Sequence, residues 1–294
     1  MRITENMRIA QTAHSLSRSA REVYDLTAMA TTGRKINRPS DGPAAYASIV
    51  SRNERMELLG SRKSTLERAE HDVALAETTL ATAGDIMARV REIAVAMADA
   101  EPGPNERKAM ATEVANLRDH LVGLANTRGT RGYLFGGTAT KTPPIDVNGV
   151  FQGNNAAINV EYADGQTSAV NLSGQDAFTA LSGGRDIFQD LTDLETELLA
   201  DNQQGVHLLI STIDQGHKQI TSVRAEAGVK MTRFSSARDV TENALVVVRS
   251  AQASEREGDA TEVFSDLATA QVAYERSLAV TRQVLGMASA MERF

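Results

Sequence analysis

The sequence contains no cysteine and no tryptophan. Without cysteine the chain forms no disulfide and no thiolate metal site, so it can live outside the cell without redox risk. Aromatic residues make up only 4% of the chain, and six prolines are spread over 294 residues. Because few prolines interrupt it and alanine is abundant, the composition favours long helices.

Long apolar runs and an excess of basic charge are also missing. No stretch approaches the 18 apolar residues that a membrane-spanning helix needs. The 31 basic and 38 acidic residues give a net charge of −7, with no basic stripe for nucleic acid. The N-terminus lacks the apolar core of a cleavable signal peptide. We therefore expect no membrane or nucleic-acid partner, and either a cytoplasmic chain or one exported with its N-terminus intact.

What the sequence does have is a heptad pattern at each end. Near the N-terminus Ile9, Leu16 and Val23 recur every seven residues. A 3.5-residue period makes a narrow apolar stripe that is buried against another helix rather than in a broad core. We predict a terminal coiled-coil domain formed by residues 1–42 and 256–294. The predicted C-terminal stripe consists of Phe264, Leu267, Gln271, Tyr274, Leu278, Thr281, Leu285 and Ala288.

Between the two ends the pattern predicts a helical bundle. Apolar residues continue at 3–4 spacing from about residue 43 to 100, and the sequence Pro102-Gly103-Pro104 forces a turn. A returning helix and a later helical region complete the pattern. We predict a central bundle built from residues 43–132 and 185–255.

Residues 133–184 differ from the rest because glycine, threonine, asparagine and aspartate crowd together there. Asp164-Gly165 stands between two short alternating runs, which is the signal of a two-residue β-hairpin. A lone hairpin is marginal in water, so we expect further strands near residues 145–151. The predicted fold class is mainly α: an elongated rod of long antiparallel helices and terminal coiled coil, with a small β insertion domain at the tip.

No set of residues with the spacing of a catalytic or metal site stands out. The five histidines show no i, i+4 pairing. Residues 146–149 begin like a calcium loop, but the remaining ligand positions do not follow. Arg34, Lys35 and Arg38 form either a basic patch for an acidic partner or a solvated turn. We predict no enzymatic activity, no cofactor and no metal.

Three segments resemble known sequences. Residues 32–43, TGRKINRPSDGP, are similar to the loop TGKRINRPSDDP of the flagellin superfamily, in the form that hook-associated proteins carry. Residues 133–138, YLFGGT, followed by TPP at 142–144, resemble a segment of the hook–filament junction family. The YERSL sequence at 274–278 is similar to that family's YEASL helix. Gly42 and the ending at 291–294 depart from the family pattern and leave the terminal contacts open.

The resemblance implies a non-enzymatic structural subunit that forms the junction between the flagellar hook and filament by helical assembly of like subunits. It implies an extracellular location in the bacterial flagellum, reached by type III export without a cleaved signal peptide. Expected partners are like subunits, another hook-associated protein on the hook side, flagellin or a filament-side adaptor, and an export chaperone. The expected assembly interface is Ile9, Leu16, Val23, Arg34, Lys35, Arg38, Phe264, Leu267, Tyr274, Leu278 and Leu285.

Two alternatives stay open from the sequence. A flagellin filament subunit would share the terminal heptads, and only residues 133–144 argue against it. A cytoplasmic coiled-coil scaffold would need its heptads to pair between two chains, and it would leave the β insertion without a purpose.

Overall fold

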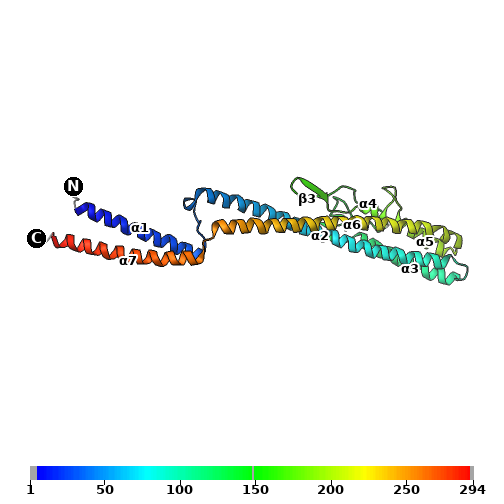
Figure 1. The fold of residues 1–294 in the computed structure, drawn as a ribbon. Coiled ribbons are helices and arrows are strands. Elements are labelled where there is room, and N and C mark those ends of the chain that lie inside the picture. The colour runs from blue at the N-terminus through cyan, green and yellow to red at the C-terminus, as the bar shows by residue number, and fades with distance from the viewer. Residues whose placement is uncertain (1–4, 148, 292–294) are drawn as a thin grey trace. The chain divides into compact units, whose positions relative to one another are not determined.

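A computed structural model describes residues 5–147 and 149–291, which are mainly α-helical (Figure 1). The chain divides into two compact units. Unit 1 comprises Met1–Leu58 with Ala244–Phe294, and unit 2 comprises Leu59–Asn243. The predicted mainly α fold with a small β portion is confirmed.

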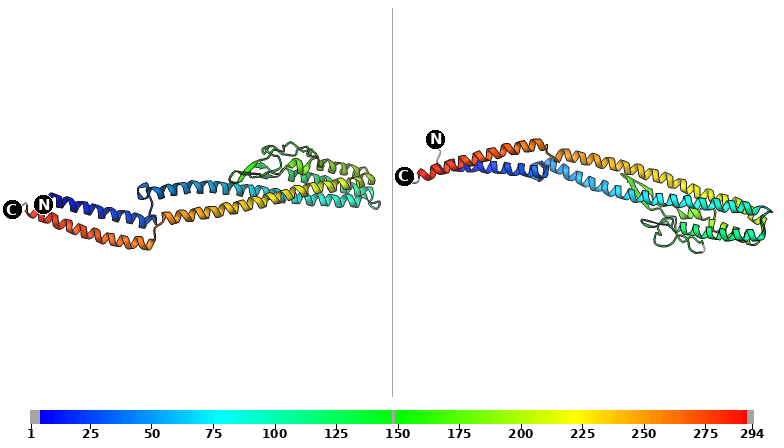
Figure 2. Two further views of the ribbon diagram at one scale, coloured as in Figure 1. Left: turned by 45° about the horizontal axis from the view of Figure 1, so that its top comes forward. Right: turned by 90° about the horizontal axis from the view of Figure 1, so that it is seen from below.

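In unit 1, α1 (Glu5–Thr32) runs antiparallel beside α7 (Ala260–Met291) (Figures 1 and 2). The predicted N-terminal stripe is confirmed, because Ile9, Leu16 and Val23 are all half-buried on α1. The intervening seam residues Thr12, Ser19 and Leu26 are half-buried as well.

The predicted stripe on α7 is confirmed in part. Leu267, Tyr274, Leu278 and Thr281 are half-buried as expected, whereas Gln271 is exposed, Phe264 is 58% exposed and Leu285 is 49% exposed. The less exposed row contains Ala270 instead, at 6%. Because the distance between packed helices depends on the side chains at their contact, short residues here allow α1 a closer approach than the larger row would. The less exposed row is Val263, Ala270, Ser277 and Val284, and Ala288 lies among residues whose side chains are not described.

The segment after α1 changes direction as its prolines and glycines predict. Gly33 takes a φ of +68°, which ends α1, and α2 (Pro43–Ala98) begins at a proline. Between them lies a single 3₁₀ turn, Pro39–Asp41. The Asp41 carboxylate at the end of this turn accepts hydrogen bonds from backbone N–H groups that precede it in the loop.

Unit 2 contains most of α2 and of α6 (Gln203–Arg256), together with α3 (Pro104–Ala125) and α5 (Ile187–Leu199). The predicted turn before α3 is confirmed. Arg107, only 2% exposed, closes it by donating to the carbonyls of Met97 and Asp99 and by pairing with Asp201 in the α5–α6 turn. One buried guanidinium thus joins the α2–α3 turn to the α5–α6 turn.

The β portion consists of two small antiparallel pairs and a short helix. β1 (Arg128–Gly129) pairs with β2 (Gly132–Tyr133), and β3 (Asn159–Ala163) pairs with β4 (Gln166–Ala169). The turn of the second pair is the predicted Asp164-Gly165, with Gly165 at a φ of +71°. Near residues 145–151, where strands were expected, the described residues form an isolated bridge between Ile145 and Phe151, and α4 (Gly174–Phe178) was not predicted.

The predicted position of the β insertion at the tip is wrong. Within unit 2 the insertion does not extend beyond the turns between the helices but packs along the sides of α2 and α6. Arg62 of α2 pairs with Glu161 of β3, and Lys230 of α6 donates to the carbonyl of Asn171. The reason is apolar burial. Phe135, Leu172 and Phe178 are buried in the same cluster as the helices and could not be covered by so small a domain alone.

Candidate assembly surface

The α1–α7 pair of unit 1 has too little core to close on itself. Among the described side chains of α1 none is fully buried, and in the described part of α7 only Ala270 is. A pair of helices covers one seam and leaves the flanks of both stripes in solvent. The surface beside this seam therefore offers partly apolar area for a further helix.

The two flanks of the seam differ in chemistry. One is a groove with charged walls and a floor of small α7 residues, lined by Arg18, Arg21, Glu22, Asp25, Leu26, Met29, Asp266, Thr269, Ala270 and Ala273. The other flank is uncharged and contains Tyr24, which is 63% exposed, beside Val23 and Tyr274. Leu278 follows Tyr274 by four residues and so lies on the same side of α7. Phe264 and Leu285 belong to the seven-residue row of Leu278. The larger α7 side chains therefore lie toward the apolar flank.

The basic loop, defined as residues 34–38, is held by backbone bonds to the chain between α6 and α7. The Lys35 N–H donates to the Arg256 carbonyl at 2.8 Å, and the Gly258 N–H donates to the Gly33 carbonyl at 3.2 Å. Ile36 is only 8% exposed and anchors the loop from below. Arg34, Lys35 and Arg38 are all exposed, so the loop presents its three basic side chains from a fixed backbone.

Asp41 supplies the remaining support for the loop. Its carboxylate accepts from the backbone N–H groups of Asn37 at 2.9 Å and Arg38 at 2.8 Å. These two bonds favour the charged form and lower the pKa of Asp41 below its ordinary value of 3.8. The sequence analysis missed this role, although an aspartate a few residues after exposed backbone donors is a known signal of local capping.

The chain segments beneath the loop are tied together as well. Arg52 of α2 pairs with Glu255 of α6 and donates to the Ala251 carbonyl at 3.2 Å, while Gln252 donates to the Asn53 side chain at 2.6 Å. The structure therefore brings the basic residues onto one short loop, and the heptad residues onto the neighbouring helix pair.

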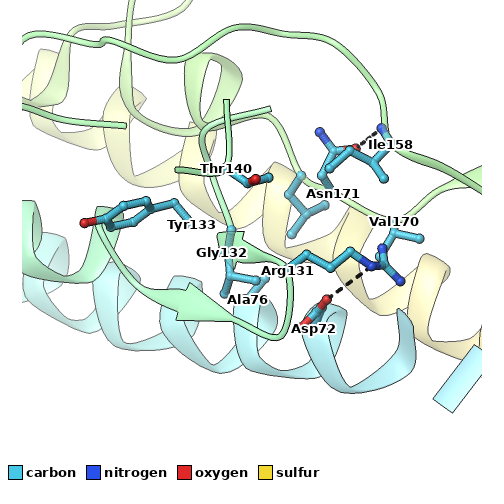
Figure 3. A pocket seen from close by; sticks show the side chains of 11 residues that line it. Asp72, Ala76, Arg131, Gly132, Tyr133, Thr140, Ile158, Val170 and Asn171 are labelled. Carbon is cyan, nitrogen blue, oxygen red and sulfur yellow. Dashed lines mark hydrogen bonds and ion pairs between the residues drawn. The ribbon is translucent and has the colours of Figure 1, made fainter. Parts of the chain in front are cut away.

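Unit 2 has a pocket between α2 and the β insertion, but its polar groups serve the fold (Figure 3). Asp72 is 5% exposed and accepts from both the backbone N–H and the hydroxyl of Thr130, each at 2.7 Å. Arg131 extends toward the same carboxylate, its Nε 4.0 Å from Oδ2. This arrangement fixes the β1–β2 turn on α2. The Asp72 carboxylate and the Arg131 guanidinium pair with each other.

Residues 5–147 and 149–291 contain neither a cluster of metal-binding side chains nor a membrane-spanning helix. No three histidine or acidic side chains in these ranges are grouped so that they could hold a metal ion. None of the helices described there has the length and apolarity required to cross a bilayer.

Comparison with known proteins relates this chain to flagellar proteins. Residues 3–140 match the bacterial flagellin N-terminal helical region. Flagellar hook-associated protein 3 of Salmonella typhimurium is 23% identical over 259 residues, which are 80% of this chain and 82% of the relative.

Solved structures share the fold. A putative flagellar hook-associated protein from Vibrio parahaemolyticus superposes with a TM-score of 0.67 at 19% identity, over 74% of this chain and 100% of that chain. FlgL of Xanthomonas campestris gives a TM-score of 0.60 at 20% identity, over 68% and 98%. Residues 3–140 are therefore similar to the N-terminal helical region of bacterial flagellin, and over four-fifths of its length the chain is similar to flagellar hook-associated protein 3.

Proposed function

We propose that this chain is a structural subunit of the bacterial flagellum that joins hook to filament by assembly of like subunits. The observation that carries the proposal is the similarity to hook-associated protein 3 over four-fifths of the chain. The same matches favour this function over the flagellin filament subunit. They also favour a non-enzymatic protein located in the flagellum.

The assembly surface we propose is the seam flanks of unit 1 together with the basic loop. The seam leaves Tyr24, Phe264 and Leu285 exposed, and large exposed apolar side chains concentrated on one surface are typical of interaction sites. The basic loop adds charge on a rigid backbone, which suits an acidic surface of a neighbouring subunit. We also propose the three-domain division predicted from the sequence, in which the terminal domain mediates assembly.

The proposed partners follow from the same function. On the hook side we expect another hook-associated protein, and on the filament side flagellin or an adaptor. We also expect an export chaperone before assembly, and export through the flagellar type III channel without a cleaved signal peptide.

Immunogold labelling of isolated flagella tests the proposal directly. The label is expected as one band at the distal end of the hook. Label along the whole filament would instead assign the chain to the filament, and absence from purified flagella would reject both. Flagella from cells that lack the gene serve as the control for non-specific label.

A further inference from the structure

The charged groove beside the α1–α7 seam is lined by side chains that the chain itself leaves unpaired. On α1 the lining includes two basic residues, Arg18 and Arg21, followed by two acidic residues, Glu22 and Asp25. All four are exposed, and in the part of the chain that the structure describes none of their side chains forms a hydrogen bond or an ion pair. The groove therefore presents two positive and then two negative charges along one helix.

Pairing within α1 suits these charges poorly. Arg18 precedes Glu22 by four residues, which is the spacing of an ion pair on one helix face. Arg21 precedes Asp25 by the same distance. At this spacing the pair is weaker when the basic residue comes first, because that order opposes the helix dipole. All four charged groups can therefore pair with a second molecule of matching charge.

The charge order of α1 is complementary to itself when one of two helices is reversed. If two α1 helices lie antiparallel about the midpoint between residues 21 and 22, Arg18 of each copy faces Asp25 of the other. In the same arrangement Arg21 of each copy faces Glu22 of the other. Four opposite-charge contacts form, whereas a parallel arrangement in register places every charge opposite its own like. The surface that matches this charge pattern is therefore a second copy of α1.

The groove also offers a floor on which a third helix can lie. Ala270 and Ala273 of α7 line it, together with the partly buried Met29 of α1. Small side chains allow helices to approach closely, and contact with this floor adds apolar burial to the charge contacts. The α1–α7 pair gains such burial only from a further helix, since Ala270 is the one fully buried side chain among those described on these two helices.

We propose that two copies of the free chain associate through the charged groove, with α1 of each copy lying antiparallel in the groove of the other. Such a contact is two-fold symmetric and closes at two chains, unlike a head-to-tail contact that extends into a helical assembly. The dimer is therefore a state of the free chain that is separate from the proposed junction, and its charged groove is covered. Because exposed ion pairs are individually weak and are screened by salt, the dimer is weak and dissociates as the salt concentration rises.

Sedimentation equilibrium of the full chain tests the dimer. At about 0.05 M NaCl we expect a monomer–dimer equilibrium with a dissociation constant on the order of 0.1 mM. At about 0.5 M NaCl, where the Debye length is less than half as long, the dissociation constant should rise about tenfold. A chain that stays monomeric up to about 1 mM at low salt, growth beyond two chains, or a dimer that does not respond to salt would overturn the proposal.

Two double variants of equal net charge separate the pairing from charge alone. Arg18→Glu with Asp25→Arg exchanges two facing charges and keeps all four contacts attractive, so the dissociation constant should stay within about threefold of the wild type. Arg18→Glu with Glu22→Arg places like charges opposite each other at all four contacts, and should raise the dissociation constant more than about tenfold. Equal effects of the two variants would overturn the charge pairing.

Loss of helix does not explain the expected difference between these variants. Arg18→Glu with Glu22→Arg gives the more favourable order of an acidic residue before a basic one, so this variant should be at least as helical as the other. Circular dichroism of both variants checks this point. Weaker association of the less helical variant instead would show that helix stability, and not the facing charges, controls the dimer.

Spin labels test the antiparallel direction, because a chain without cysteine accepts a label at a single introduced position. Gln11→Cys places the label at an exposed site on α1. In the proposed dimer residue 11 of one copy lies opposite residue 32 of the other, so the two labels are about 30 Å apart along the helices. Parallel pairing would bring them within about 15 Å of each other, and a distance in that range would overturn the proposal.

Discussion

In the basic loop, the groups that hold the loop in place are different from the groups that present its positive charge. Backbone bonds at Lys35 and Gly33 hold the loop in place, together with the buried Ile36 and the carboxylate of Asp41. The guanidinium and ammonium groups take no part in these contacts. A charge change in the loop should therefore alter what the loop binds without altering the loop itself.

Arg38→Glu tests this separation. Because Arg38 is exposed and its guanidinium adds only a weak charge attraction to Asp41 beside the hydrogen bond of its backbone N–H, the melting temperature of the free chain should stay within about 1 °C of the wild type, as is usual for surface changes. Junction formation in flagellated cells should fall, since the charge presented to a neighbour is reversed. Arg38→Lys is the matched control. A parallel loss of melting temperature and assembly would show that the side chain serves the chain's own fold.

The pH dependence of the loop should follow Asp41. Its pKa is lowered in the folded chain by the N–H groups of Asn37 and Arg38, so the stabilisation is present above 3.8 and is lost as the pH falls toward the folded pKa. Carbon-detected NMR titration of the carboxyl group should therefore give a midpoint below 3.8, with Asp41→Asn used to assign the resonance. A midpoint at or above 3.8 would contradict the two hydrogen bonds.

At the scale of elements, α7 carries two alternative rows that could pack on α1 beside the row of Leu267 and Tyr274, and the row of Ala270 is the less exposed of the two. Leu267 belongs to the row common to both possibilities, whereas Phe264 belongs to the more exposed row. The two side chains therefore contribute differently, although the sequence pattern treats them alike.

Alanine substitutions at these two positions should give opposite results. Leu267→Ala removes half-buried apolar surface and should destabilise the α1–α7 pair by about 1 kcal/mol, roughly half the value for full burial. Phe264→Ala should leave that pair unchanged and impair junction assembly. Circular dichroism melting reports the first effect, and hook–filament joining in cells reports the second. Equal destabilisation by both would show that Phe264 is in the seam.

The thin seam also makes a prediction for the free chain. Ordering a residue costs roughly 1–2 kcal/mol of backbone entropy, while isolated helices are marginal in water. With Ala270 the only buried apolar side chain in the described parts of α1 and α7, the pair recovers little of this cost. Amides of both helices should exchange rapidly in the monomer and become protected on assembly. Slow exchange throughout both helices of a monomeric sample would contradict this.

At the scale of the whole chain, apolar burial is divided unequally between the units. The large core cluster, from Leu66 to Phe234, lies entirely in unit 2. Among the described residues of unit 1, the buried apolar side chains are Ile36, Ile49 and Ala270. Because apolar burial is the main stabilising contribution to folding, unit 2 should be the more stable of the two.

Heating should therefore unfold the chain in two steps, with unit 1 first. Phe234→Ala creates a cavity in a fully buried site, and should cost about 3–5 kcal/mol and lower only the upper transition. Differential scanning calorimetry of the monomer measures both transitions. A single cooperative transition, shifted as a whole by Phe234→Ala, would show instead that the two units fold as one.

Several local features of this protein could be predicted from its sequence. The seven-residue recurrence of Ile9, Leu16 and Val23, the Pro102-Gly103-Pro104 turn and the Asp164-Gly165 hairpin each depend on residues close in the chain, so their signals are readable from sequence. The same holds for the loop at residues 32–43, whose motif carries the family resemblance. These features were sufficient to predict the mainly α fold and its function class.

Choices between nearly equivalent packings were left to the tertiary structure. Whether α7 buries Ala270 or Phe264 depends on how closely α1 approaches, and a one-residue difference in helical phase is not visible in a pattern where both rows are periodic. The β insertion lies along the helices because its apolar side chains are buried there, and it is also held by Arg62 and Lys230, which are far from it in sequence and look like ordinary surface residues there. Long-range contacts of this kind arise from the shape and charge of surfaces that exist only after the helices have formed.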